Sequence, residues 1–347
     1  MNILVTGSTG FIGAQLCRAL VEHGHKVRAF HRATSNLRLI ADLEVEHAVG
    51  DLTLPDTVQA AMQGSEVVFH AAAQLGGNEP GRMYTVTVEG TRTVLQAALE
   101  AGVRRVVYTS TVAAMGVPEQ APERHIQTAA FLLDENHTWN FRPDFWPYGY
   151  TKYLAELEAQ KAVASGLDVV IVNPTVVFGP GDIYRQDNSI IMQVAQRKVK
   201  FLVEGGLNAV HIMDVVDGHM AALEHGRCGE RYILGGENLT HLDLIRMIAG
   251  VVEAPAPILV IPGGVVRFLA RPARLLQPFL NLAVSASDLH LAGYHFYFDT
   301  RKAHVELGLL PPRSVKEAII EAYEWFKQPL GLISLPAKEI FFHKIRL

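Results

Sequence analysis

Tyr148 and Lys152 stand four residues apart, a spacing that places two side chains one above the other on the same face of a helix. A neighbouring ammonium group stabilises a phenolate and lowers the pKa of a phenol from its usual value of about 10. Tyr148 could therefore exchange a proton with a carbonyl or alcohol oxygen near neutral pH. We predict that Tyr148 is a general acid/base and that Lys152 is its electrostatic partner.

The same spacing occurs at Tyr323 and Lys327, so spacing alone does not identify a site. Tyr323 belongs to an amphipathic segment with isoleucines and a tryptophan, which predicts a packing role. Tyr148 instead precedes a predicted helix and the last strand of the first half of the chain. This context favours Tyr148 as the reactive phenol.

Hydroxyl side chains follow the apolar run 106–108 at Thr109, Ser110 and Thr111. An open α/β sheet binds its ligands at the carboxyl ends of its strands, where such a hydroxyl could hold a substrate oxygen. Small hydroxyl residues at a strand end also commonly satisfy backbone groups. The residues alone leave both interpretations open.

Three glycines lie in the segment 6–13 (TGSTGFIG), which leads from the first apolar run into a helical pattern. Unpaired backbone N–H groups and the positive end of a helix attract an anion at such a place. The glycines allow a tight turn, close approach to a pyrophosphate and close packing of helix on strand. This context predicts a dinucleotide site. The expected contacts are Gly7, Thr9, Gly10, Phe11, Ile12 and Gly13.

The end of the second predicted strand reads Phe30-His31-Arg32. Proteins that bind NAD usually carry an acidic residue there for the adenosine ribose diol. Arg32 offers a planar set of donors suited to a 2′-phosphate, so we favour NADP(H), with NAD(H) as the alternative. We predict that His31 and Arg32 contact the cofactor. A solvated surface arginine is the simpler interpretation of Arg32.

Later strand ends supply further predicted cofactor contacts, which are Asp51, Leu52, Ala71, Ala72 and Ala73. Asp51 could accept a hydrogen bond from the adenine amine, although Asp is also a common turn residue. The small alanine side chains would let the backbone lie along the nicotinamide ribose. Lys152 could hold the hydroxyls of that ribose, beside Tyr148.

Short β-branched runs alternate with segments of helical period along the first half of the chain. Strands are predicted at residues 3–6, 27–30, 67–69, 106–108 and 169–172, and helices at residues 12–23, 86–101 and 151–165. This alternation is typical of an α/β fold with a doubly wound parallel sheet, the Rossmann fold. Residues 1–173 form the predicted dinucleotide-binding domain. Residues 174–327 form mainly a smaller substrate lobe, with some elements returning to the first domain, and 328–347 an extension of unknown role.

The composition argues against several classes of partner. Among 347 residues, 31 Lys and Arg against 35 Asp and Glu give a net charge of -4, which offers no basic field for a nucleic acid. Cys17 and Cys228 are the only cysteines and lack metal-ligand spacing, so we expect neither a disulfide framework nor a metal site. The sequence shows no signal peptide and no apolar run long enough to span a membrane, which predicts a cytoplasmic protein.

The motif residues named above make the chain resemble the extended short-chain dehydrogenase/reductase family, also called the NAD-dependent epimerase/dehydratase family, over Met1 to Lys327. The matching positions are Gly7, Gly10, Gly13, Asp51, Thr109, Ser110, Thr111, Tyr148, Lys152, Asn173, Pro174 and residues 179–182. The resemblance implies that Thr111 is the hydroxyl member of the catalytic triad, with Ser110 as the fallback. It also implies that Asn173 and Pro174 contact the cofactor.

Within that family, the chain looks most like the group of dihydroflavonol reductases, 3β-hydroxysteroid dehydrogenases and hopanoid-associated sugar epimerases. Residues 207–215 and 229–238 are similar to stretches of the last of these, the hopanoid-associated sugar epimerases. The chain departs from the family pattern at three positions. Thr87 stands where many members carry Asn, Met213 stands where an Asp often precedes Asp214, and His31 replaces the Asp of NAD-preferring members. A proton relay through an Asn at position 87 is therefore not expected.

We predict an oxidoreductase that transfers a hydride between NADP(H) and a ketone, aldehyde or secondary alcohol. One alternative is a nucleotide-sugar epimerase with a retained NAD. Another is a non-catalytic NADP(H) sensor, which the intact Tyr148, Lys152 and Thr111 argue against. The expected partner is a small-molecule substrate, and a homodimer is a common state of such enzymes.

Residues 265–282 combine apolar side chains with Arg267, Arg271 and Arg274 on one side. We predict an amphipathic helix that packs on the lobe with its arginines toward solvent, and a new helix or a kink at Pro272. The alternative is a mobile lid over a hydrophobic substrate, which touches a membrane surface through the arginines.

Overall fold

The computed structural model describes residues 1–74, 80–119, 132–183, 189–257, 259–268 and 289–328. Within these residues the central sheet has seven parallel strands in the order β10-β6-β5-β4-β1-β2-β3. They are β1 (Asn2–Thr6), β2 (Lys26–His31), β3 (Glu46–Val49), β4 (Val67–His70), β5 (Arg105–Thr109), β6 (Val169–Pro174) and β10 (Arg231–Leu234). The strand order reverses between β1 and β4, the place where a doubly wound sheet binds ligands. The predicted α/β fold with a doubly wound parallel sheet is confirmed.

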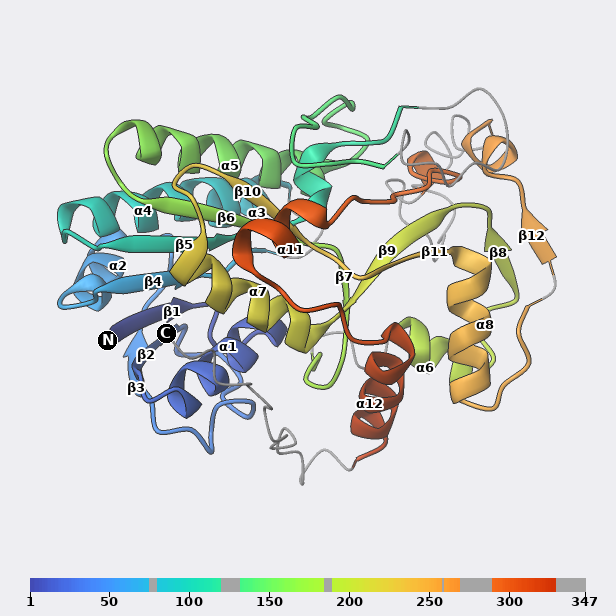
Figure 1. Cartoon of the computed structure of the whole chain (residues 1–347), viewed down its shortest axis with the longest axis horizontal. Helices are drawn as coiled ribbons and strands as arrows, with labels where there is room; N and C mark the ends of the chain where they lie inside the picture. The colour runs from blue at the N-terminus through green and yellow to red at the C-terminus, as the bar shows by residue number, and fades with distance from the viewer. Residues whose placement is uncertain (75–79, 120–131, 184–188, 258, 269–288, 329–347) are drawn as a thin grey trace.

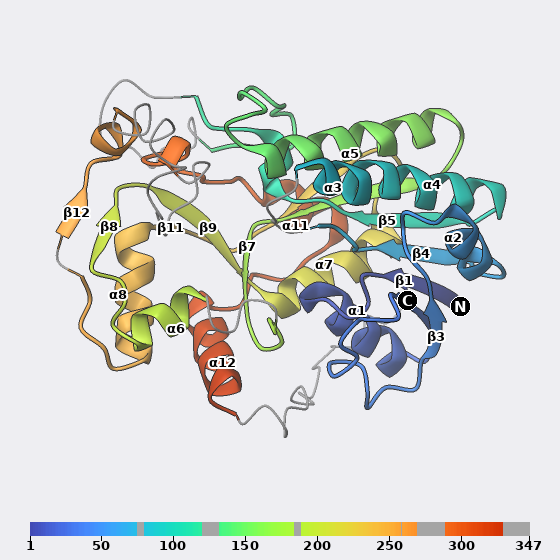
Figure 2. The same ribbon diagram turned by 180° about the vertical axis from the view of Figure 1, so that it is seen from behind.

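Helices cover both faces of this sheet (Figures 1 and 2). α1 (Phe11–Glu22) and α7 (Ile212–His225) pack on one face, and α2 (Pro55–Met62), α4 (Gly90–Glu100) and α5 (Pro147–Ala164) pack on the other. Successive residues of a strand point to opposite faces of the sheet. Ile3 and Val5 pack in the core under α1, whereas Leu4 packs in the core under α4 and α5. Burial on both faces explains why the inner strands, such as β4 and β6, are largely apolar runs.

A second body follows β6 and carries a small mixed sheet. In this sheet β9 (Gly206–His211) pairs antiparallel with β11 (Glu237–Thr240) and parallel with β7 (Val176–Phe178). Its other elements are β8 (Phe201–Val203), β12 (Leu259–Ile261), α6 (Ile190–Ala195), α8 (His241–Val251) and α12 (Val315–Lys327). α7, β10 and α11 (Arg301–Leu307) pack with the central sheet instead, so the chain returns to the first body.

One predicted helix has a different form. Residues 86–101 were expected as a single α-helix, but the structure has α3 (Pro80–Tyr84), a π-helix (Thr85–Glu89) and then α4. A π-turn holds one more residue than an α-turn, and it redirects the side chains that precede it. The hydroxyl of Thr87, in the middle of this turn, accepts a hydrogen bond from the backbone N–H of Gln74 at 3.2 Å.

Part of the predicted amphipathic segment, residues 269–282 with Arg271, Pro272 and Arg274, lies outside the described residues, as do residues 329–347 of the predicted extension. Residues 263–268 are helical. Arg267, which we expected to face solvent, instead donates to the backbone oxygen of Ala292 and lies 5.3 Å from the ring centroid of Tyr294.

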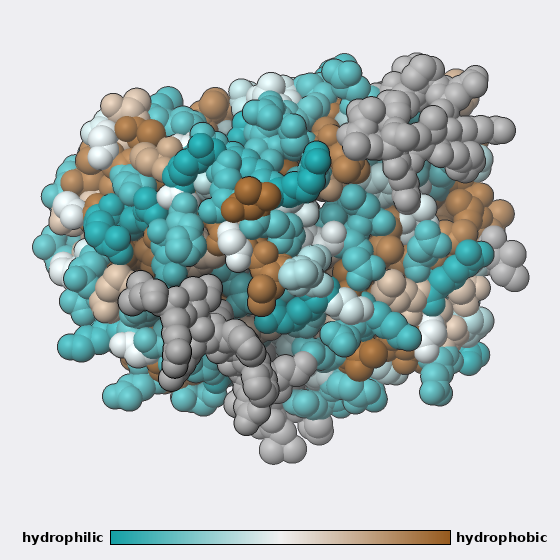
Figure 3. Space-filling model, in the orientation of Figure 1, coloured by the Kyte–Doolittle hydropathy of each residue, from teal (hydrophilic) through white to brown (hydrophobic). Residues whose placement is uncertain are grey.

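None of the helices in the described part of the chain combines the length and the apolar character that a membrane crossing requires. On the face shown in Figure 3, hydrophobic residues occur as small separate groups among hydrophilic ones.

Candidate active site

The glycine segment forms the turn between β1 and α1. Gly7 has a φ of 69°, and a Cβ there would lie 2.8 Å from the backbone of Ala71 and Ala72. The loop therefore lies against the end of β4 with no room for a side chain. No side chain caps the N-terminus of α1, and its first turn carries no acidic residue. This cradle, open to the cavity described below, fits the pyrophosphate of a dinucleotide.

Gly13 has no room for a side chain. A Cβ at Gly13 would overlap the Gly7 carbonyl group, whose carbon lies only 2.7 Å away, and this obstacle is backbone rather than a flexible side chain. We expect Gly13→Ala to displace α1 from the loop and to weaken cofactor binding more than about tenfold. Titration of the cofactor against both proteins tests this, with Gly250→Ala as control, since a Cβ at Gly250 meets nothing within 4 Å. Unchanged affinity in Gly13→Ala would contradict the assignment of the loop.

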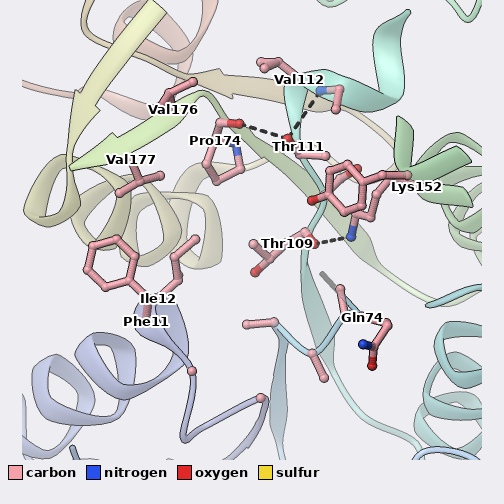
Figure 4. Close-up of a pocket in the computed structure, with 18 of the residues that line it drawn as sticks. Phe11, Ile12, Gln74, Thr109, Thr111, Val112, Lys152, Pro174, Val176 and Val177 are labelled. Atoms are coloured by element: carbon pink, nitrogen blue, oxygen red, sulfur yellow. Dashed lines mark hydrogen bonds between the residues drawn. The ribbon is translucent and has the colours of Figure 1, made fainter. Parts of the chain in front are cut away.

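A cavity of about 1360 Å³ runs from this loop across the carboxyl edge of the sheet to the second body. It is lined by predicted site residues from both halves of the site: Gly7, Thr9, Gly10, Phe11, Ile12, Gly13, His31, Arg32, Asp51, Leu52, Ala71, Ala72, Ala73, Thr111, Tyr148, Lys152 and Pro174. Asn173 does not line the cavity and is fully buried behind it. Figure 4 shows Phe11 and Ile12 across the cavity from Thr111 and Lys152.

Tyr148 and Lys152 both lie on α5, which begins at Pro147, four residues earlier than the predicted helix. Lys152 is 2 % exposed, and its Nζ donates to the backbone oxygen of Thr109 at 2.9 Å and to the Tyr108 hydroxyl at 3.0 Å. Burial lowers the pKa of Lys152 to about 8, although the Glu156 carboxylate opposes this shift. The ammonium group is thus fixed at the end of β5 by two oxygen acceptors.

A network of buried polar side chains lies behind Lys152. The ring of His70 stacks on Tyr108 at 5.4 Å, and its two nitrogens contact the hydroxyls of Thr6 at 2.7 Å and Thr91 at 3.0 Å. Burial and the nearby charge of Lys152 lower the pKa of His70 to about 3. The ring is therefore neutral at physiological pH, and Lys152 is the only charged residue of this hydrogen-bonded network.

Thr111 lies two residues after the end of β5, where it caps a short 3-10 helix (Val112–Met115) and lines the cavity. Its hydroxyl lies 3.4 Å from the Pro174 backbone oxygen and accepts a weak hydrogen bond from the Ala113 N–H at 3.3 Å (Figure 4). The Asn173 amide donates to the Thr111 backbone oxygen at 3.0 Å and to the Glu156 carboxylate at 2.7 Å. Asn173 therefore ties the Thr111 backbone to the helix that carries Lys152.

The opposite end of the cavity holds the residues expected near the adenosine. Arg32 is exposed at the end of β2, and its backbone N–H donates to the Ser35 hydroxyl at 3.2 Å. The ring of His31 faces β3, where it contacts the His47 ring at 3.0 Å. Burial alone would raise the pKa of Asp51, but hydrogen bonds from the N–H and hydroxyl of Thr53, together with the charge of Arg32, lower it.

Sequence reasoning missed two members of this arrangement. Tyr108 was assigned only to a strand, and no local pattern indicates that its hydroxyl meets Lys152 from another element. Glu156 does have a signal, because it follows Lys152 by four residues on the same helix and so shares its face. Within the described residues, no group of three or more His, Cys, Asp or Glu side chains could hold a metal ion.

The family described as "NAD dependent epimerase/dehydratase family" matches residues 3–235 of this sequence. The chain belongs to this family. It is therefore an NAD(P)-dependent enzyme of the extended short-chain dehydrogenase/reductase type, and the fold and the glycine loop described above are those that the family resemblance implied.

Proteins with several different names are similar to it. A Synechocystis sp. protein named "Putative dihydroflavonol 4-reductase" is 36% identical, over 93% of this chain and 94% of its own. The solved structure of gox2253 is 36% identical with a TM-score of 0.80, covering 94% of this chain and 97% of that one. PA4631 of Pseudomonas aeruginosa, called a nucleoside-diphosphate-sugar epimerase, is 27% identical with a TM-score of 0.76 over the same shares.

Proposed function

We propose that the protein is a reductase or dehydrogenase that transfers a hydride between NADP(H) and a ketone, aldehyde or secondary alcohol. The observation that supports this most is the position of Tyr148 and Lys152 on one face of α5, in the same cavity as the glycine loop. The reductase name of the Synechocystis relative agrees with it.

In this proposal, the bound nicotinamide cofactor supplies or accepts the hydride. Tyr148 donates a proton to the substrate oxygen during reduction and takes it back during oxidation. Lys152, held by Thr109 and Tyr108, stabilises the phenolate that remains after donation. The Thr111 hydroxyl, two residues after β5, hydrogen-bonds the same substrate oxygen and orients it toward Tyr148.

The second candidate is a nucleotide-sugar epimerase with a retained NAD, and the name of PA4631 supports it. Such an enzyme returns its cofactor to the starting state, so it releases none and shows no net redox change. The deciding experiment is to unfold the purified protein and measure released nicotinamide cofactor, then to follow NADPH and NADH consumption with simple ketones and aldehydes. Stoichiometric NAD with no consumption would contradict the reductase.

We further propose that Arg32 holds the 2′-phosphate of NADP(H), with Ser35 beside it in the lining of the cavity. Arg32→Asp is expected to weaken NADP(H) binding at least about tenfold and to spare or improve NAD(H) binding, because it exchanges a phosphate donor for a diol acceptor. Fluorescence titration with both cofactors measures this. Arg246→Asp, an exposed arginine on α8 that does not line the cavity, is the control. If Arg32→Asp keeps the wild-type preference, Arg32 is a surface residue.

A further inference from the structure

The end of the cavity that faces the second body is lined mostly by apolar side chains. We call it the substrate end and define it as Trp146 and the lining residues between 175 and 298. Its apolar members are Trp146, Val176, Val177, Val203, Leu207, Val266, Leu289, Leu291, Ala292, Tyr294, Phe296 and Phe298. Trp146 directly precedes α5, so the apolar lining begins beside Tyr148.

Three aromatic rings form a continuous wall within the substrate end. The ring centroids of Trp146 and Phe296 lie 5.7 Å apart, and those of Phe296 and Tyr294 lie 5.9 Å apart. The π-faces of such a wall favour contact with flat or cyclic apolar groups.

Most polar side chains of the substrate end already form hydrogen bonds with other groups of the protein. Asn208 accepts hydrogen bonds from the Thr175 hydroxyl at 2.8 Å and the Gly236 N–H at 2.9 Å, and its amide donates to Asn238 at 2.9 Å. These bonds leave Asn208 and Thr175 little capacity for a polar ligand. The same bonds explain how the two side chains are tolerated beside so many apolar ones.

The described residues of the substrate end include no Lys or Arg, and their titratable side chains are those of Asp182, His241 and Tyr294. A nucleoside diphosphate carries at least two negative charges, which proteins usually meet with Arg, Lys or a helix N-terminus. Asp182 would add repulsion. The lining therefore disfavours a nucleotide-sugar and favours an uncharged molecule.

His241 is a further polar residue of the substrate end. It is the first residue of α8, and its Nδ1 donates to the backbone oxygen of Val203 at 3.0 Å. Burial lowers the pKa of His241, so the ring is neutral and Nε2 carries a lone pair. No partner of Nε2 occurs among the described residues, and His241 belongs to the cavity lining.

We propose that the substrate end binds an uncharged cyclic apolar ketone or alcohol with a second hydroxyl remote from the reacting carbon, and that Nε2 of His241 accepts the hydrogen bond of that hydroxyl. This inference rests on the proposed function for the identity of the reacting group. The apolar lining, and an Nε2 of His241 that has no partner among the described residues, carry the rest.

Two matched probes test it, 2-tetralone and 6-hydroxy-2-tetralone, with UDP-glucose as the charged comparison. Calorimetric titration of the protein saturated with NADP+ and, separately, NAD+ measures binding without turnover. We expect both tetralones to bind more tightly than UDP-glucose, and the hydroxylated one about fivefold more tightly than the other. Phe296→Ala should weaken both tetralones about tenfold, whereas Phe201→Ala, at an exposed ring outside the lining, should change neither.

His241→Asn separates the hydrogen bond from the fold. The Asn amide can still donate to Val203 as Nδ1 does, but it does not extend to the position of Nε2. We expect the variant to bind 2-tetralone as the wild type does and to lose the fivefold preference for the hydroxylated probe. A preference that survives in His241→Asn overturns the role of His241.

The remaining outcomes distinguish this inference from the proposed function. Tighter binding of UDP-glucose, or no binding of either tetralone, overturns the apolar substrate class even if the protein reduces other carbonyl compounds. Tetralone binding without consumption of NADPH or NADH leaves the substrate class standing and contradicts the proposed hydride transfer.

Discussion

Tyr148→Phe is expected to lower kcat at least about 100-fold and to leave the Kd of the cofactor near its wild-type value. The change removes one hydroxyl from the cavity and keeps the ring that packs at the start of α5. Only the proton transfer to or from the substrate oxygen is lost. Steady-state turnover and a cofactor titration of the same preparation measure the two quantities.

Tyr323→Phe is the matched control. Tyr323 also precedes a lysine by four residues, and the Nζ of Lys327 lies 4.8 Å from its ring centroid, but the pair is on α12 and does not line the cavity. Wild-type turnover is expected for this variant. Equal losses in the two variants would mean that Tyr148 acts through packing and not as an acid.

Lys152→Met should reduce turnover about 100-fold and at the same time change the pH dependence of stability. Burial lowers the pKa of Lys152 in the folded protein to about 8, from 10.5 in the unfolded chain. Between these values the unfolded chain binds more protons than the folded protein, so this group makes stability rise with pH. Below pH 8 the lysine is charged in both states, and its burial costs free energy.

The difference between wild type and variant isolates this effect from all other titrations. The free energy of unfolding of the wild type, minus that of Lys152→Met, should increase by about 2 kcal/mol from pH 7 to pH 10. Urea denaturation of both cofactor-free proteins across this range measures it. A difference that stays constant with pH would show that Lys152 titrates normally and is not held as a buried cation.

The central sheet was predictable because both of its faces are buried. Strands such as Asn2–Thr6 and Val169–Pro174 then read as apolar runs, and the helices between them keep a helical period. The π-helix at Thr85–Glu89 was not predictable, since a one-residue insertion in a helix leaves no local composition signal. The lining of the substrate end was equally inaccessible, because it comes from loops and short strands whose side-chain directions follow no period.

The sequence by itself determined which groups lie together wherever short spacings encode the grouping. The loop from Gly7 to Gly13 lies within one turn between strand and helix, and Tyr148 and Lys152 are one helical turn apart, so local backbone geometry is enough to bring their members together. Only the tertiary structure decided what surrounds them. Tyr108 reaches Lys152 from β5, and His241 joins the cavity from α8, because sheet pairing and the docking of the second body bring together residues that no local period relates. Burial, which lowers the pKa of Lys152, arises from that same convergence.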